Sequence, residues 1–164
     1  MAFTLLPVFG GEGKAPPMNK EKSLLIDYVD PFIGTTNFGT TNPGAVCPNG
    51  MMSVVPFNVM GSADNTYDKD ARWWSTPYEY TNCFFTGYSH VNLSGVGCPE
   101  LGSLLLMPTT GELNVDYKEY GSKYKDEQAS PGYYSNYLTK YNIKTEVSAT
   151  CLLYTSDAAD EEDS

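Results

Sequence analysis

The residues best suited to chemistry lie between positions 73 and 108. This segment holds both tryptophans of the chain, Trp73 and Trp74, its only histidine, His90, and four glycines between positions 87 and 102. Indole rings offer flat apolar faces on which a ligand ring can stack, and closely spaced glycines allow tight backbone turns. The segment therefore predicts a surface that contacts a ligand.

The two tryptophans are adjacent in sequence, so in an extended segment Trp73 and Trp74 point to opposite faces. One indole can then pack in the core while the other presents its face to a ligand ring. The alternative is that both tryptophans are structural. The residues alone leave both interpretations open.

The single histidine, His90, stands beside Ser89 and two positions before Asn92 in a glycine-rich turn. A histidine acting as a general base needs a partner that orients its ring, and no acidic residue is close to it in sequence. One interpretation is a histidine that is hydrogen-bonded into the turn or shapes a domain interface. The other is a contact with a substrate hydroxyl.

Two sets of acidic residues could carry other chemistry. Glu79 and Glu100 could form the carboxylate pair of a glycosidase. Asp68 and Asp70 with Asn65 suggest a calcium loop, but the glycine and terminal glutamate of an EF-hand are absent, so a solvated loop is the better interpretation.

The elements that position these residues are short strands joined by turns rich in glycine, asparagine and proline. Extended segments are expected at residues 50–56, 84–88, 104–107, 112–117, 133–138 and 143–149. The apolar run at 104–107 is expected to be buried, whereas the charged residues 122–130 are expected to form a loop or one helical turn. No amphipathic helix of ten residues is predicted. The sequence therefore predicts a mostly β protein, a partial antiparallel β-sandwich.

Glycines in the central segment are expected to meet backbone needs, either a positive φ or a close approach. These are Gly95, Gly97 and Gly102.

Composition excludes several classes of function. A chain of 164 residues fits one domain, and a net charge of −10 argues against a nucleic-acid partner. The longest apolar runs fall far short of the about 20 residues that a transmembrane helix needs. The four cysteines form no C-x-x-C pair and, with one histidine, no zinc-site spacing, so they are expected to be buried or half-buried thiols.

The two ends differ from the middle. Residues 1–27 start with a short apolar stretch that no basic residue precedes, and they are expected to be a leader or the remnant of a secretory signal, without fixed structure. Residues 151–164 hold five of the twenty acidic residues, and 151–161 resemble the translation of a transposase-type sequencing adapter. A natural acidic tail is the alternative. The domain is therefore expected to cover residues 28–150.

Several motifs occur in a fixed order along this domain. They are Val-Asp-Pro-Phe-Ile-Gly at 29–34, Asn-Pro-Gly-Ala at 42–45 with Pro48 and Gly50, Gly-Tyr-Ser-His-Val-Asn-Leu-Ser-Gly-Val-Gly at 87–97, Leu-Leu-Leu-Met-Pro-Thr-Thr-Gly at 104–111, and Ala-Ser-Pro-Gly-Tyr-Tyr-Ser at 129–135. Together they resemble the N-terminal domain of family-92 glycoside hydrolases, the bacterial exo-acting α-mannosidases. The family often has a second histidine where this chain has Asn92, and this departure bears on the finer substrate specificity.

The resemblance implies a two-domain enzyme, in which an N-terminal β-sandwich packs against a C-terminal (α/α)6 barrel with the active site between them. It implies calcium-dependent hydrolysis of α-mannoside glycans with inversion at the anomeric carbon, which needs an acid and a base about 6.5–9.5 Å apart. In the family those carboxylates and the calcium ligands belong to the barrel. No catalytic residue or metal ligand is therefore expected in this chain, which is expected to be inactive by itself.

For the central segment, the resemblance implies one wall of the substrate pocket, with the tryptophans on the leaving-group side. The expected substrate-binding residues are Trp73, Trp74, His90 and Asn92. The resemblance places the catalytic acids elsewhere than Glu79 and Glu100. It also implies a periplasmic, cell-surface or secreted location in a bacterium.

Two functions of other classes stay open. One is a carbohydrate-binding β-sandwich that uses the tryptophans without catalysis. The other is a structural β module whose exposed aromatic residues meet a partner protein.

Overall fold

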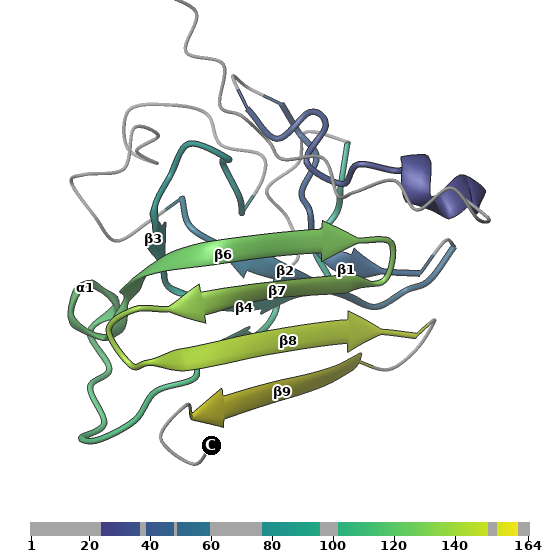
Figure 1. Cartoon of the computed structure of the whole chain (residues 1–164). Helices are drawn as coiled ribbons and strands as arrows, with labels where there is room; N and C mark the ends of the chain where they lie inside the picture. Colours follow the sequence, from purple (N-terminus) through teal and green to yellow (C-terminus); the bar gives the residue numbers. More distant parts are fainter. Residues whose placement is uncertain are drawn as a thin grey trace, which may run out of the picture.

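The described part of the chain folds into two antiparallel sheets that face each other (Figure 1). The computed structural model describes residues 24–36, 39–47, 49–59, 77–95, 102–150 and the backbone of 154–160. The first sheet has the order β1-β2-β4-β5, and the second has the order β3-β6-β7-β8-β9. The predicted mostly β, sandwich-like class is confirmed.

The strands up to residue 106 are short, and those from residue 122 onwards are longer. They are β1 (Ala45–Val46), β2 (Ser53–Phe57), β3 (Phe84–Phe85), β4 (Gly87–His90), β5 (Leu105–Leu106), β6 (Ser122–Ser130), β7 (Tyr133–Leu138), β8 (Ile143–Ala149) and β9 (Tyr154–Asp160). The helices in the same residues are a 3-10 helix, η1 (Leu25–Tyr28), and a single α-helical turn, α1 (Tyr117–Tyr120). Neither is long or apolar enough to cross a membrane.

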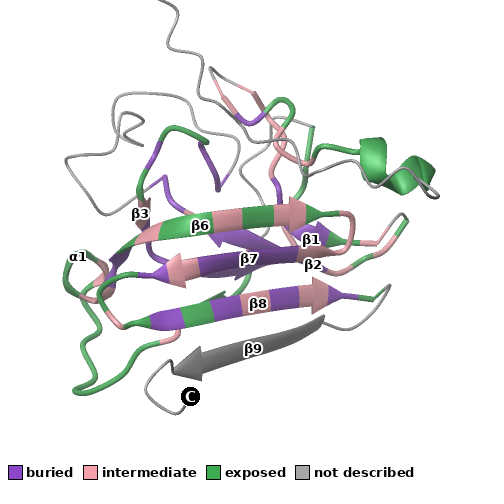
Figure 2. Cartoon of the chain, viewed as in Figure 1, coloured by how far each residue is buried: buried purple, intermediate pink, exposed green. Residues whose placement is uncertain are grey.

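The core lies between the two sheets, where β1 and β2 pack against β7 and β8. Its buried cluster is Ala45, Val54, Phe85, Tyr88, Tyr134, Leu138, Val147 and Ala149. Along β7 the three consecutive residues Tyr134, Ser135 and Asn136 are all buried. Figure 2 shows buried residues alternating with more exposed ones along β8. This pattern follows from the period of two in a strand, with one face in the core and one in solvent.

The hairpin of β7 and β8 confirms the alternation seen in the sequence. Ile143, Thr145, Val147 and Ala149 are all buried, while the residues between them are exposed or half-buried. The turn between the strands contains Asn142 at a φ of 58°, a conformation that asparagine tolerates better than most residues.

The prediction of a loop or helical turn at residues 122–130 is wrong, because these residues form β6. The strand pairs with β3 on one side and β7 on the other. Its charged side chains are compatible with a strand because one face of this sheet is open to solvent. A β-bulge interrupts the pairing with β7 between Lys125 and Gln128.

The strand predicted at residues 112–117 is also wrong. Leu113 and Val115 are each 85% exposed, and no described strand pairs with this segment. Side chains offer the backbone an alternative here, since Asn114 Oδ1 accepts from the N–H of Asp116 and Asp116 Oδ1 accepts from that of Lys118. Such local hydrogen bonds favour turns and helix starts over strands.

The apolar run at 104–107 does contain a strand, β5, but its predicted burial is wrong. Leu105 and Leu106 are 39% and 43% exposed. The strand lies at the edge of its sheet and pairs with β4 alone among the described strands. The prediction of buried or half-buried thiols holds for half-buried Cys47 but not for Cys83, which is exposed.

The ends of the chain leave two predictions untested. Residues 1–23 of the predicted leader lie outside the described residues. The backbone of β9 pairs with β8, and the interpretation of 151–164 as adapter translation stays a prediction.

Candidate functional site

The turn that follows β4 belongs to the predicted ligand surface. It is formed by His90, Val91 and Asn92, and we call it the His90 turn. Val91 has a φ of 60°, which is strained for a β-branched side chain. Its backbone N–H donates to the carbonyl oxygen of Ser53 at 3.0 Å. Strained residues of this kind cluster at functional sites. The His90 turn is therefore a candidate functional site.

His90 is only 3% exposed, and the carbonyl oxygen of Leu104 fixes its ring. That oxygen lies 3.0 Å from Nδ1 and accepts the backbone N–H of His90 at 3.1 Å. Nδ1 must carry a proton to donate to a carbonyl, so Nε2 is the acceptor of the neutral ring. The geometry matches a histidine bonded into the turn, and its contact with a substrate hydroxyl stays a prediction.

Asn92 is half-buried, and its backbone is tied to Ser53. The Asn92 N–H donates to Ser53 Oγ at 3.0 Å, and this hydroxyl donates to the Asn92 carbonyl at 3.3 Å. The side-chain Nδ2 of Asn92 has no acceptor among the residues that the structure describes. A buried amide donor without a partner calls for an explanation, such as a water or a ligand.

Two glycines of the central segment confirm the predicted backbone needs. Gly95 and Gly102 have φ values of 84° and 79°. A Cβ at Gly102 would lie 2.9 Å from Asn92 Oδ1 and 3.0 Å from Ser89 Oγ. Because Gly102 has no side chain, the amide oxygen of Asn92 can lie this close to its backbone. Gly97 lies outside the described residues.

A second polar cluster, the tyrosine cage around Glu127, was not predicted from the sequence. Tyr78 donates to Glu127 Oε2 at 2.9 Å, and Tyr134 donates to Oε1 at 2.5 Å. Tyr124 lies beside them and shares a 2.8 Å hydrogen bond with Asn58. Tyr78 is 49 residues from Glu127 in the chain, whereas Tyr134 is seven residues away on the neighbouring strand β7. No local motif predicts the cage.

Burial dominates the electrostatics of this cage. It raises the pKa of the Glu127 carboxyl, although the hydrogen bonds from Tyr134 and Tyr78 oppose the shift. Burial also raises the pKa of the Tyr78, Tyr124 and Tyr134 hydroxyls, so all three remain neutral donors.

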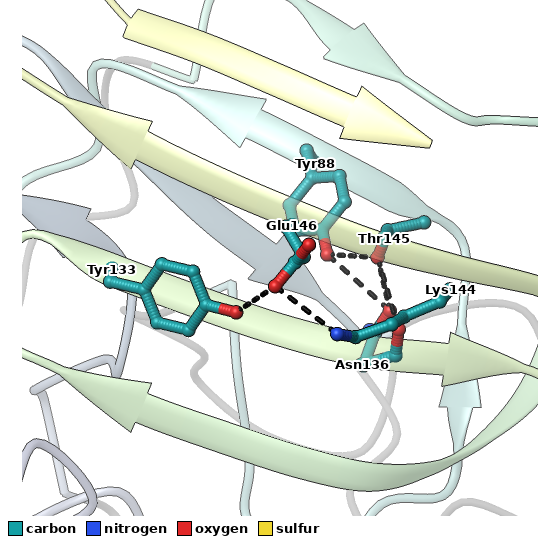
Figure 3. Close-up of polar contacts among 6 residues, drawn as sticks. All are labelled: Tyr88, Tyr133, Asn136, Lys144, Thr145 and Glu146. Atoms are coloured by element: carbon teal, nitrogen blue, oxygen red, sulfur yellow. Dashed lines mark hydrogen bonds and ion pairs between the residues drawn. The ribbon is translucent and has the colours of Figure 1, made fainter. Parts of the chain in front are cut away.

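A buried hydrogen-bond relay connects the cage to the opposite sheet. Figure 3 shows the contacts of this relay among Tyr88, Thr145 and Asn136. Thr145 Oγ1 lies 2.6 Å from the Tyr88 hydroxyl and 2.5 Å from Asn136 Oδ1. Asn136 Nδ2 in turn lies 3.5 Å from the Tyr134 hydroxyl. Polar groups therefore cross the core with their partners satisfied, as buried polar groups require.

The remaining predicted residues fall into two groups. Glu79 is buried, and its Oε1 accepts from the Thr81 hydroxyl at 3.2 Å. The others lie outside the described residues: Asn65, Asp68, Asp70, Trp73, Trp74, Cys98 and Glu100. Neither the carboxylate pair nor the sugar-facing tryptophans can thus be placed.

A calcium ion finds no fitting donor set in the part of the chain that is described. No three side chains of His, Cys, Asp or Glu come together there. The acidic cage residue, Glu127, is occupied by tyrosine hydroxyls, which would have to give way to a hard cation.

Three solved structures similar to this chain are glycoside hydrolases of family GH92. A family GH92 α-mannosidase from Bacteroides thetaiotaomicron matches 77% of this chain at 32% identity with a TM-score of 0.65, and the match spans 17% of that protein. The family GH92 glycosyl hydrolase ccman5 matches 80% of this chain at 29% identity with a TM-score of 0.61, over 18% of its own length. An inverting GH92 mannosidase from the same Bacteroides species, at 24% identity and a TM-score of 0.54, shares the fold.

The family comparison covers the same region. No curated protein matches the chain. The family model described as "Glycosyl hydrolase family 92 N-terminal domain" matches residues 28–151. The resemblance is confirmed, and the chain belongs to glycosyl hydrolase family 92.

Proposed function

We propose that this chain is part of an inverting, exo-acting α-mannosidase. The observation that carries the proposal is the 32% identity over 77% of this chain to an α-mannosidase of the same family. A second structure of that relative holds mannoimidazole. The substrates are α-mannoside glycans, and the proposed location is the periplasm, the cell surface or the exterior of a bacterium.

The catalytic work is proposed to lie outside these 164 residues. The chain spans about a sixth of its structural relatives, which leaves most of such an enzyme to other segments. A helical barrel would supply the acid, the base and the calcium ligands. The chain would supply one wall of the pocket through Trp73, Trp74 and the His90 turn.

The test uses the complete reading frame that encodes this chain, expressed as one protein. It is expected to release mannose from 4-nitrophenyl α-mannoside, to lose activity in a calcium chelator and to regain it with added calcium. The first product seen by NMR should be β-mannose, because inversion changes the anomeric configuration. Release of glucose or galactose but not mannose from matched glycosides would refute the assignment.

The pocket wall is tested in the same protein with Trp73→Ala and Trp74→Ala. At least one variant is expected to raise KM for the mannoside, because a stacked aromatic ring is a binding anchor. Tyr28→Ala, at an exposed position on η1, is the matched control. Unchanged KM in both tryptophan variants would remove the stacking role.

A further inference from the structure

The outward face of β6, β7 and β8 carries a regular array of polar and aromatic side chains that the proposed function does not use. Strand pairing aligns three rows across the strands: Lys125, Tyr137 and Lys144; Gln128, Ser135 and Glu146; Ser130, Tyr133 and Ser148. The residues between them, such as Asn136 and Thr145, are buried in the core. These rows therefore lie on the face away from the sandwich interior.

The array is hollowed in the middle. The central side chain of the three rows is the small Ser135, which is only 2% exposed between its larger neighbours and has a tyrosine on either side of it along β7. Tyr133 and Tyr137 are four residues apart, or about 13 Å along an extended strand. A hollow of about 340 Å³ is lined by Lys125, Asp126, Gln128, Ser135, Asn136, Tyr137 and Lys144. We call this hollow, with Tyr133 at its far end, the β7 trough.

The bulge in β6 forms one wall of the trough. Asp126, at a φ of 53°, lies within the bulge. Asn136 has no paired residue on β6, because the register passes from Tyr137 directly to Ser135. Bulges commonly re-aim side chains next to binding sites.

Both tyrosine rings are held in place at their hydroxyl ends. Tyr133 donates to Glu146 Oε1, which also accepts from Lys144 Nζ at 3.2 Å (Figure 3). The Tyr137 hydroxyl donates to Asn142 Oδ1, and Lys125 Nζ lies 4.8 Å from the centre of the Tyr137 ring. Rings fixed before binding lose little conformational entropy when a ligand arrives.

The chemistry of the trough selects one class of ligand. Its two lysines are each matched by an acid, Lys125 by Asp126 at 3.8 Å and Lys144 by Glu146 at 3.2 Å, so the local charge is balanced. A polyanion would in addition be repelled by the chain, whose net charge is −10. The rows contain no aliphatic side chain, which disfavours the apolar centre of a protein interface.

We propose that the β7 trough is a non-catalytic binding site for a short neutral oligosaccharide. Tyrosine faces suit the C–H faces of sugar rings, and the amide, hydroxyl, ammonium and carboxylate groups between them supply donors and acceptors for sugar hydroxyls. The hollow is at the small end of ligand-site volumes, which fits one or two sugar rings. This site is separate from the His90 turn, and it stands whether or not the complete protein hydrolyses mannosides.

Affinity electrophoresis of the 164-residue chain tests the proposal, with yeast mannan, starch, xyloglucan or heparin cast in native gels. Retardation is expected in at least one of the three neutral polysaccharides and not in heparin. Tyr137→Ala and Gln128→Ala should each weaken the retarding interaction, the tyrosine variant by roughly five- to tenfold, the scale of losing an aromatic anchor. Tyr28→Ala is the matched control and should leave retardation unchanged.

Three outcomes would overturn the proposal: no retardation by any neutral polysaccharide, retardation by heparin alone, or equal retardation of wild type, Tyr137→Ala and Tyr133→Ala. Circular dichroism of each variant separates lost binding from lost folding. Both tyrosines are only half-buried, so their truncation is expected to leave the spectrum unchanged. Mannose release by the complete protein is measured separately, so the two proposals can fail independently.

Discussion

The hydroxyl of Tyr134 donates to Glu127 Oε1 at 2.5 Å, so a carboxyl on β6 is bound from the neighbouring strand β7. The second oxygen of the same carboxyl accepts from Tyr78, which precedes β3. One acidic side chain thus joins three segments inside the sandwich. Because burial disfavours the charged form of this carboxyl, we expect the ionisation of Glu127 to make the stability of the fold depend on pH.

Replacing Glu127 by glutamine should change the pH dependence of stability. Burial raises the folded-state pKa of Glu127 above its unfolded value, so its contribution is fully present below the unfolded pKa of about 4.3. It is lost as pH rises through the folded pKa, because the folded state then holds a proton that the unfolded state has released. Glu127→Gln cannot ionise and should keep that contribution.

The measurement is the melting temperature of both proteins from acidic to neutral pH. The variant is expected to gain on the wild type as pH rises and to be at least as stable at neutral pH. Glu112→Gln, at an exposed position, is the control and should follow the wild-type curve. Parallel curves for Glu127→Gln and wild type would contradict the prediction.

Thr145→Val should destabilise the fold by about 1–3 kcal/mol, the usual cost of leaving buried polar groups without a partner. The change keeps the shape but removes the hydroxyl between Tyr88 and Asn136. The Tyr88 hydroxyl would then keep only its longer hydrogen bond to Asn136 Oδ1, at 3.4 Å. Urea denaturation measures the loss.

Two further variants define the cause. Thr145→Ser keeps the hydroxyl and should retain more of the stability than Thr145→Val. Thr110→Val, at an exposed threonine, should change stability little. A valine variant as stable as wild type would mean that the relay contributes nothing.

Gly102→Ala should cost more stability than Gly111→Ala. Both glycines have a positive φ, 79° and 83°, so both substitutions carry a similar backbone strain. Only at Gly102 would the new Cβ also press on Asn92 and Ser89, whereas nothing lies within 4 Å at Gly111. The difference between the two free energies of unfolding therefore reports the contact alone, and equal losses would disprove it.

Val91→Gly should relieve strain in the His90 turn. Glycine adopts a φ near 60° without the penalty of about 1–2 kcal/mol that other residues incur, so the variant should be equal to or more stable than wild type. Val54→Gly, in the core of β2, is the contrast and should be strongly destabilising. A marked loss of stability in Val91→Gly would show that its side chain matters more than its backbone.

Part of this fold follows from the sequence because its physical causes are local. The hairpin of β7 and β8 was predictable, since Thr145 and Val147 alternate with polar residues on strands that have one face in solvent. The need for glycine at Gly95 and Gly102 was predictable for a similar reason. Each requirement is set by the conformation of a single residue.

The strand β6 could not be predicted because its bulge inverts the alternation. Tyr124 packs on the core before the bulge, whereas Glu127 and Ala129 lie on the inner side after it. The inward-facing residue before the bulge has an even number, and those after it have odd numbers. The apolar and polar residues of the strand therefore do not follow one continuous period of two. The segment then resembles a charged loop.

The tyrosine cage was missed for another reason. Tyr78 is 49 residues from Glu127, and Tyr134 lies on the neighbouring strand β7, so only the tertiary fold brings all three side chains together. Residues 112–117 show the converse error. Their alternation is genuine, but without a neighbouring strand the side chains of Asn114 and Asp116 bind the backbone instead.

The thiol of Cys47 offers a direct view of how the two sheets separate. Its Sγ donates to the carbonyl oxygen of Ala149 at 2.9 Å, which ties the end of β1 to the end of β8. An alkylating reagent can modify this sulfur readily only when that contact opens, whereas the exposed Cys83 should react without such an opening. The ratio of the Cys47 labelling rate to the Cys83 labelling rate therefore reports how often the two sheets separate at this contact.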